Sequence, residues 1–341
     1  MLSERGRATI IDVARLSGTS IKTVSRVFND EPFVRPATRE RVLNAASELE
    51  YHPNMAARSL VRGRSSLIGL FYENPSPNYV VDLQTGSLDR LHGERFMLLL
   101  FPCETAGQVV GRLPGIARSA GLEGMILAPP IGDDPATIAA LLDARIPFAR
   151  IAPTYAADSA PAVRIDDVSA ARDMTRHLLA LGHRRIGVIK GDPTHPSSAE
   201  RLQGYREALA EAEAAFDPSL IDEGRYTFDS GLAAGRRLLA GPARPSAIFA
   251  LNDDMAAGVL VAAQERGLSV PADLSIAGFD DSLISRVVWP QLTTIRQPTY
   301  DMAHRATDAL LARLKGDQCE TIQQLAYELL VRGSTGPCET A

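Results

Sequence analysis

The sequence has little of what marks several classes of protein. Among its 341 residues only three are cysteines (Cys103, Cys319 and Cys338), far apart and without a CxxC pair, so neither a disulfide framework nor a zinc site is indicated. No apolar run approaches the ~20 residues of a membrane-spanning helix, and the start, MLSERGRATI, lacks the apolar core of a signal peptide. With 45% apolar and 23% charged residues, the chain is not disordered. We therefore expect a cytoplasmic, soluble protein of two or three domains that contacts no membrane.

Signatures of common enzyme classes are missing as well. The chain has no GxGxxG, GxxxxGK[ST], HExxH or GxSxG motif, so dinucleotide-binding, P-loop, zinc-protease and serine-hydrolase functions lack support. Asp253-Asp254 and Asp280-Asp281 are paired carboxylates of the kind that glycoside hydrolases use, but no catalytic motif accompanies them. We expect no enzymatic activity, no cofactor and no metal.

Charge is divided unevenly along the chain. Residues 1–64 contain eleven Arg and Lys against seven Asp and Glu, a net charge of +4, whereas the whole chain carries −5 and the remainder therefore −9. A basic head on an acidic body favours a polyanionic partner for the head alone, although a solvated surface explains the same charge.

The head has the pattern of a helix-turn-helix. Thr9 and Asp12 form a capping box for a first helix that ends near Gly18, and Ser20 begins a second helix, Ile21 to Asn29. The second helix has an apolar stripe, formed by Val24, Val27 and Phe28. Its opposite face presents groups suited to reading base edges in a major groove, namely Ile21, Lys22, Ser25, Arg26 and Asn29.

A third helix and a short basic segment follow. Pro36 is placed as the first residue of a helix that runs to about Leu49, with an inward face of Val42, Leu43, Ala46 and Leu49. Asn54 then begins a segment from Met55 to Arg62 that is too short to be a stable isolated helix. It would fold mainly on DNA or against a second copy.

The stretches TIIDVARLSGTSIKTVSRVFND and VRPATRERVLNAASELEYHPNMAARSLVRGRSSLIGL resemble the lactose-repressor/galactose-repressor (LacI/GalR) family of transcriptional regulators. The resemblance implies phosphate contacts by Thr9, Ser20, Thr23, Ser25 and Asn29. It implies base contacts by Ile21, Lys22 and Arg26, with Arg26 suited to guanine. It also implies a DNA-kinking hinge helix at 54–62, with Asn54, Ala57 and Leu60 at the minor groove. One departure is Arg35, which stands where the family often has a capping serine.

From Ser65 onward, short apolar strands alternate with amphipathic helices, a pattern typical of α/β doubly wound layers. Seven segments are predicted to be buried parallel strands: SLIGLFY, RFMLLLF, GMILAPP, PFARIA, RIGVIKG, SAIFALN and LSIAGFD. The helical stretches include Val80–Gly93, Ala170–Leu181, Ala199–Ala214, Ser230–Leu239 and Met255–Arg266.

The family resemblance continues through LLALGHRRIGVIKGD, FALNDDMAAGVL and SVPADLSIAGFDDS, and it implies a two-lobed core like that of periplasmic binding proteins. We expect a DNA-binding head at 1–64 and a core for effector binding and dimerisation at 65–341. We place the N-lobe at about 65–163 and 296–325, and the C-lobe at about 164–292 and 328–332. The three chain crossings between lobes are expected near 163–166, 292–296 and 325–328.

Ligand-binding residues are expected at the carboxyl ends of the strands, where open α/β sheets bind ligands. Arg201, Asn252 and Asp280 match the family's usual trio, which together can bond sugar hydroxyls. Tyr79 and Tyr226 match aromatic wall positions, although a lone aromatic residue is usually part of the core. His195 and Ser197 lie in the loop before Arg201 and are further candidates, although a loop histidine is as often bonded only to backbone groups. Trp289 lies just before the second chain crossing and is another. Ala128 and Ala152 replace polar residues of some sugar-binding members, which predicts a drier N-lobe wall.

The leading hypothesis is therefore a homodimeric transcriptional regulator, most simply a repressor, that binds a palindromic operator in double-stranded DNA. A small carbohydrate or related metabolite in the cleft would control it by changing the angle between the lobes. The alternatives are a sugar-binding module or a carbohydrate-active enzyme that binds no operator.

Overall fold

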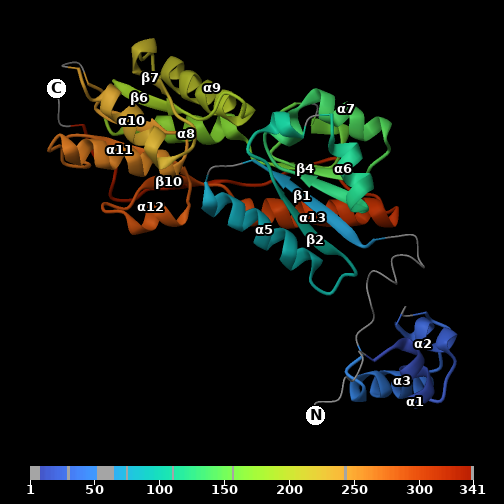
Figure 1. Ribbon diagram of the computed structural model, residues 1–341. Coiled ribbons are helices and arrows are strands. Elements are labelled where there is room, and N and C mark those ends of the chain that lie inside the picture. Colours follow the sequence, from blue (N-terminus) through green and yellow to red (C-terminus); the bar gives the residue numbers. More distant parts are fainter. Residues whose placement is uncertain are drawn as a thin grey trace. The chain divides into compact units, whose positions relative to one another are not determined.

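The computed structural model describes residues 8–28, 31–51, 65–73, 76–109, 111–155, 157–241 and 244–338. The chain separates into two compact units, Met1–Ser65 and Ser66–Ala341 (Figure 1). No helix in these ranges is long and apolar enough to cross a membrane. The expected hinge segment, 54–62, lies outside the described residues.

The head consists of α1 (Ile10–Leu16), α2 (Ile21–Phe28) and α3 (Pro36–Glu48) around a small apolar core. Val13, Val24, Val27 and Val42 are buried there, as the apolar spacing of the three helices predicts. The sequence assignment of Leu43 to this core is wrong, because Leu43 is 46% exposed and Ala45 is buried instead. Positions 42, 45, 46 and 49 form the continuous helical stripe, and position 43 lies beside it.

The larger unit contains two six-stranded sheets, one in each lobe. The N-lobe sheet has the strand order β11 (Ile322–Gln324), β5 (Ala162–Arg164), β4 (Phe148–Ile151), β3 (Leu122–Leu127), β1 (Leu67–Tyr72), β2 (Met97–Pro102). The C-lobe sheet has the order β12 (Glu328–Leu330), β10 (Thr293–Arg296), β9 (Ser275–Asp280), β8 (Ala247–Ala250), β6 (Ile186–Lys190), β7 (Ile221–Glu223). All neighbouring strands are parallel except β10 and β12, which pair antiparallel at the edge of the sheet.

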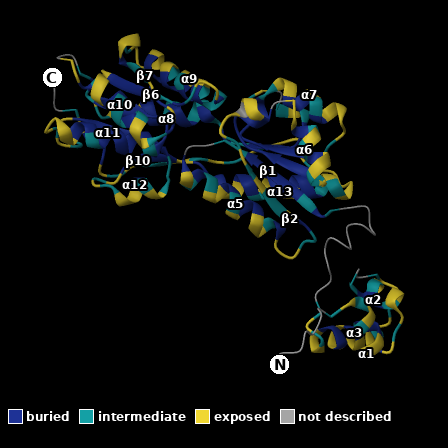
Figure 2. Ribbon diagram, in the orientation of Figure 1, coloured by how far each residue is buried: buried dark blue, intermediate teal, exposed yellow. Residues whose placement is uncertain are grey.

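Helices cover both sheets, and the buried residues lie between the layers (Figure 2). The N-lobe helices are α5 (Pro77–Leu91), α6 (Leu113–Ala120), α7 (Pro135–Asp143) and α13 (Thr299–Lys315). The C-lobe helices are α8 (Asp167–Ala180), α9 (Pro196–Glu211), α10 (Phe228–Leu238), α11 (Asp253–Glu265) and α12 (Leu283–Val287). Short 3₁₀ turns occur at Ala106–Gln108, Ile131–Asp133, Ala157–Ser159 and Pro218–Leu220.

Helix α9 shows how closely these helices pack. It lies directly against α8, and a Cβ at Gly204 of α9 would collide with the carbonyl oxygen of Val168 in α8. Glycine is therefore required at this crossing. The contact fixes α9, whose first two turns carry the candidate ligand residues Ser197 and Arg201.

The chain passes between the lobes three times. It leaves the N-lobe sheet after β5 at Arg164 and reaches α8 at Asp167, and it returns to the C-lobe between β11 and β12. The second crossing is later than the expected 292–296, because β10 still pairs with β9 through Arg296. The crossing therefore occupies Gln297 and Pro298, before α13 joins the N-lobe.

Strand β2 corrects a second expectation. The run RFMLLLF looks like a fully buried strand, but β2 is the outer strand of its sheet, and Met97 and Leu100 are 47% and 43% exposed. Apolar composition alone does not distinguish a central strand from an outer strand whose apolar side chains are exposed.

Candidate functional site

Helix α2 of the head has one buried and one exposed face. Val24 and Val27 are buried against α1 and α3, whereas Ile21, Lys22 and Arg26 are exposed. Ser25 is half-buried at the edge of this face. The arrangement leaves one apolar and two cationic side chains together on an exposed helix face, which suits contacts to base edges and phosphates.

Hydroxyl groups gather at the starts of α1 and α2. The Thr9 amide and hydroxyl both donate to Asp12 Oδ2, at 3.0 and 2.6 Å, and these bonds lower the pKa of Asp12. At α2, Ser20 Oγ accepts from the Thr23 amide at 3.1 Å and lies 2.9 Å from the Thr23 hydroxyl. These groups cap their helices, and the positive end of each helix dipole at this point favours a phosphate.

The structure describes only part of the expected DNA surface. Thr9, Ser20, Ile21, Lys22, Thr23, Ser25 and Arg26 lie within the described residues. The remaining candidates, Asn29, Asn54, Ala57 and Leu60, lie outside them. Their expected roles at the phosphates and in the minor groove remain predictions.

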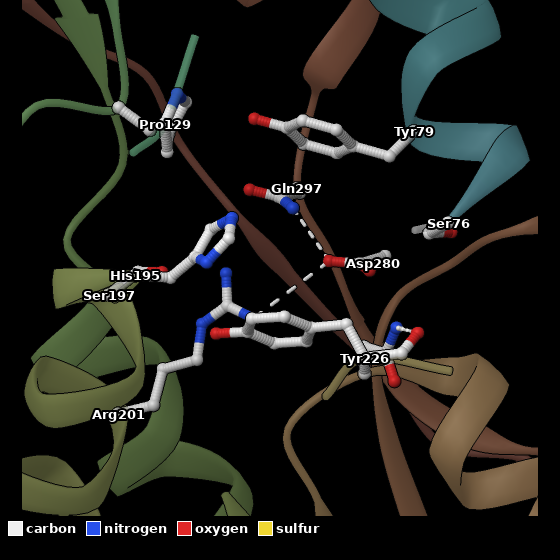
Figure 3. Close-up of a pocket in the computed structure, with 11 residues that line it drawn as sticks. Ser76, Tyr79, Pro129, His195, Ser197, Arg201, Tyr226, Asp280 and Gln297 are labelled. Carbon is white, nitrogen blue, oxygen red and sulfur yellow. Dashed lines mark hydrogen bonds and ion pairs between the residues drawn. The ribbon is translucent and has the colours of Figure 1, made fainter. Parts of the chain in front are cut away.

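In the larger unit, a small cavity of about 30 Å³ lies between the lobes (Figure 3). Seven of the eight predicted ligand residues line it: Tyr79, His195, Ser197, Arg201, Tyr226, Asn252 and Asp280. Ser76, Pro129, Ala152 and Gln297 complete the lining. This volume is enough for one or a few water molecules, so a ligand of sugar size requires the lobes or side chains to move apart.

Arg201 is the main fixed cation of the cavity. Its Nε donates to Asp167 at 2.7 Å, its Nη1 donates to the Leu251 carbonyl at 2.7 Å, and its guanidinium lies 3.5 Å from the centre of the Phe279 ring. Burial disfavours its charge, but Asp167 and the other acidic groups outweigh this and raise the pKa of Arg201. The Nη2 group makes no hydrogen bond to any residue that the structure describes, so it is available to a ligand.

Asp280 is the carboxylate that lines the cavity beside Arg201. It is the last residue of β9, with a φ of 111°, and its Oδ1 accepts from Gln297 Nε2 at 2.6 Å and lies 4.0 Å from Arg201 Nη1. Burial raises the pKa of Asp280 to about 7, against the opposing influence of Arg201 and Gln297. Near neutral pH this group can therefore either accept or donate a hydrogen bond.

Aromatic rings form the walls of the cavity. Tyr79 of α5 comes from the N-lobe, and Tyr226 comes from the loop before α10 in the C-lobe (Figure 3). His195 packs edge-on against Tyr226 with ring centres 5.3 Å apart. Burial raises the pKa of both tyrosines and lowers the pKa of His195, so all three are neutral near pH 7. The Tyr226 hydroxyl is buried and lies close to Ser197.

Asn252 positions the cavity wall as well as lining it. Its Oδ1 accepts from the Met255 amide at 2.9 Å and caps α11, and its Nδ2 donates to the Tyr226 carbonyl at 2.9 Å. The backbone of Tyr226 is held at a φ of 59°, a conformation that a tyrosine adopts only when its surroundings impose it. Asn252 therefore holds the Tyr226 main chain in place.

Trp289 is the one predicted ligand residue that the structure does not bring to the cavity. It lies between α12 and β10, is 82% exposed, and is absent from the lining. Its position in sequence suggested proximity to the second crossing, but that crossing begins only at Gln297. Trp289 is therefore on an outer surface.

Residues that the sequence did not single out also reach the cavity. Gln297 lies directly after β10, and Ser76 directly precedes α5. Each is a polar residue beside a proline at an element boundary, a signal too common to identify a site. Of Ala128 and Ala152, for which the sequence predicts a drier N-lobe wall, only Ala152 lines the cavity, where Pro129 is also apolar.

The paired carboxylates have structural partners rather than a catalytic arrangement. Asp253 is buried and accepts from the Ser282 amide at 2.7 Å and from the Thr294 hydroxyl at 2.7 Å. Asp281 forms ion pairs with Arg296 and Arg332. Of the four carboxylates, only Asp280 lines the cavity. Within the described ranges there is also no group of three His, Cys, Asp or Glu residues that could hold a metal ion.

Comparison with known proteins agrees with both parts of the chain. Residues 9–54 match the family model for bacterial regulatory proteins of the lacI family, and residues 175–335 match a periplasmic binding protein-like domain. The HTH-type transcriptional regulator DegA of Bacillus subtilis (strain 168) is 33% identical over 337 residues, which cover 98% of this chain and 100% of DegA.

Two solved structures extend the likeness to the fold. A lac repressor dimer bound to operator and the anti-inducer ONPF matches with a TM-score of 0.85 and 28% identity, over 97% of this chain and 100% of that one. A complex of the transcriptional regulator CelR with cellobiose matches with a TM-score of 0.74 and 32% identity, over 96% and 100% of the two chains. The relatives are regulators rather than enzymes, and this chain belongs to the lacI family of bacterial transcriptional regulators, with a helix-turn-helix head and a two-lobed core.

Proposed function

We propose that this regulator is a cytoplasmic repressor that binds a palindromic operator as a homodimer and releases or retains it according to a small neutral carbohydrate in the cleft. One observation carries the proposal: a single chain combines an exposed Lys22 and Arg26 face on α2 with a buried polar cavity between two lobes. The first feature suits DNA and the second suits a small polyhydroxy ligand.

The charges of the cavity favour an uncharged effector. The positive charge of Arg201 is already balanced by Asp167 at 2.7 Å and by Asp280, and His195 is neutral near pH 7. A phosphate or carboxylate ligand would therefore meet no uncompensated cation here. The available groups are instead Arg201 Nη2, Asp280, Gln297 and the tyrosine hydroxyls, which alternate donors and acceptors as neighbouring sugar hydroxyls require.

A dimer is supported by exposed apolar side chains on both lobes. Val81 and Leu88 of α5 are 56% and 51% exposed, and the neighbouring edge strand β2 adds Met97 and Leu100. On the C-lobe, α12 and the residues after it expose Leu283, Val287 and Trp289. The electrostatic interaction of Asp82 in α5 with Arg286 in α12 indicates that the two groups of side chains are adjacent. Large exposed apolar patches of this kind typically mark interfaces.

The test begins with selection of DNA by the full chain from a random library, followed by footprinting of the enriched sequences. We expect a two-fold symmetric site with half-sites about one helical turn apart. The operator complex is then titrated with neutral mono- and disaccharides and with sugar phosphates, and binding to the protein is followed by thermal shift. Absence of any enriched sequence would contradict operator binding. Preference for sugar phosphates would contradict the proposed effector class.

A further inference from the structure

An ion pair joins Arg26 of α2 to Glu31, in the loop that follows the helix. Arg26 Nε lies 3.3 Å from Glu31 Oε2, and the two side chains are 48% and 43% exposed. The shortest nitrogen–oxygen distance of the pair is to Nε, and the two terminal nitrogens of Arg26 make no hydrogen bond within the described residues. Those are the nitrogens that form a bidentate end-on fork to O6 and N7 of guanine.

The main chain holds Glu31 in place for this contact. The Glu31 amide donates to the Arg26 carbonyl at 3.1 Å, and the Glu31 carbonyl accepts from Arg39 Nη2 at 2.9 Å. Arg39 also donates to the Val27 carbonyl at 3.3 Å, so α3 is tied to the last turn of α2 and to residue 31 together. The carboxylate is thus presented from a fixed backbone position.

The position of the Glu31 carboxylate, near the C-terminal end of α2, is unfavourable without a cationic partner. A carboxylate beside the C-terminal end of a helix faces the negative end of the helix dipole. In a DNA complex a carboxylate near the groove would also be repelled by phosphates. A side chain with both disadvantages needs a compensating role, and its contact with the Nε of Arg26 provides one.

From this geometry we propose that Glu31 is a positioning residue for base reading, which orients the Arg26 side chain toward guanine. Arginine has several rotatable bonds, and ordering them on binding weakens affinity. If Glu31 already holds the Arg26 side chain at Nε, the side chain loses less conformational entropy when it binds guanine. The fixed side chain also reaches fewer alternative acceptors on other bases. The inference rests on the proposed operator binding and on Arg26 as a base contact.

Glu31→Gln tests the role in the full chain, with DNA selected by the unmodified protein. We expect affinity for the selected operator to fall about threefold to tenfold, the change that corresponds to ordering one free side chain. Discrimination among the four base pairs should weaken at one operator position only. Affinity for scrambled DNA should stay the same or rise, because an acidic charge has been removed.

Two controls separate positioning from a general charge effect. Glu48→Gln removes the same charge from an exposed position on α3, and it should not lower operator affinity. In an Arg26→Gln background, Glu31→Gln should no longer reduce operator affinity, because its effect passes through Arg26. Discrimination is a ratio measured within one variant, so it does not depend on the fraction of protein that is folded.

The possible results are distinct. If DNA is selected but Glu31→Gln leaves operator affinity and discrimination unchanged, or lowers affinity equally in the Arg26→Gln background, Glu31 does not position Arg26. If no sequence is selected by the unmodified chain, the proposed operator binding itself fails.

Discussion

The Ser76 hydroxyl donates a 2.7 Å hydrogen bond to Asp254 Oδ2 and thereby links the two lobes. Ser76 precedes α5 in the N-lobe, and Asp254 lies in the first turn of α11 in the C-lobe. A second link runs from His195 Nε2 to the Glu73 carbonyl at 3.4 Å, a longer and weaker contact. Ser76 and His195 also line the cavity, so the contacts that close the lobes belong to the candidate ligand site itself.

Ser76→Ala should therefore favour separation of the lobes and strengthen effector binding. The variant leaves Asp254 without this donor in the closed arrangement, and a hydrogen bond to a charged group contributes about 1.5–3 kcal/mol. Because the cavity of the closed arrangement is too small for a sugar, destabilising that arrangement should raise the apparent affinity measured by calorimetry about tenfold. Thr85→Ala is the matched control, because the Thr85 hydroxyl on α5 donates to the Val81 carbonyl of its own helix and makes no other hydrogen bond within the described residues. Equal effector affinities of the two variants would show that the contact between Ser76 and Asp254 plays no part in effector binding.

Arg201 should matter for folding as well as for binding. Arg201→Met keeps much of the side-chain volume but leaves Asp167 buried without its ionic partner, a loss of about 3–5 kcal/mol in the free energy of unfolding. Urea denaturation measures this change, and the double variant Asp167→Asn/Arg201→Met should recover part of it. A single variant as stable as the unmodified protein would show that the pair contributes little to the fold.

Asp280 predicts a pH dependence of stability. Its pKa in the folded chain is about 7, above the ordinary value of 3.8, so the folded state holds this proton more tightly than the unfolded state. The free energy of unfolding then decreases as pH rises from about 4 to 7. Asp280→Asn, which tolerates the same backbone conformation, should stabilise the protein by up to a few kcal/mol at pH 8 and little at pH 4.

Thermal melts at both pH values check this prediction, with Glu200→Gln as the comparison. Glu200 also has a pKa raised to about 7 by burial, but it does not line the cavity. Both variants should therefore flatten the pH profile, and only Asp280→Asn should also reduce effector affinity. An Asp280→Asn profile parallel to that of the unmodified chain would contradict the assignment.

Residues at the carboxyl ends of apolar runs were the part of the site that the sequence could predict. Asn252 follows β8 and Asp280 ends β9, and topology alone brings such positions to one edge of a sheet. Ser76 lies between β1 and α5 at such an edge, but nothing in the sequence separates it from other serines in loops. Gln297 could not be identified this way, since its place depends on where the chain crosses between the lobes. Trp289 was misplaced for the same reason.

The head was predicted well because its helices are short and their apolar spacing is regular. Leu43 is the exception, since α3 has apolar residues at both 42 and 43 and only one can face inward. The pairing of Arg26 with Glu31 had no sequence signal, because it depends on the path of the loop between α2 and α3.

Arg26→Ala tests the reading face of α2 directly. Loss of a bidentate guanine contact should weaken operator binding by about 1–3 kcal/mol and relax one base position, as measured by electrophoretic mobility shift. Arg15→Ala is a control, because Arg15 is an exposed cation on α1 that pairs with Asp12. A uniform loss across all DNA sequences would instead identify Arg26 as a phosphate contact.

Val287→Glu should separate the proposed dimer. Val287 is 67% exposed on α12, and a carboxylate there would be buried without a partner in the proposed interface, at a cost of several kcal/mol. Sedimentation should show a monomer for this variant and a dimer for the unmodified chain.

Trp289, the single tryptophan of the sequence, reports on the same surface. It is 82% exposed in one chain, so its emission should lie at shorter wavelength in a dimer that covers it than in the Val287→Glu monomer. Leu142→Glu is the control, because Leu142 is 41% exposed on α7, away from the proposed interface. That variant should sediment as a dimer with unchanged Trp289 emission. If Leu142→Glu dissociated the dimer and Val287→Glu did not, the interface would not be formed by α5, β2 and α12.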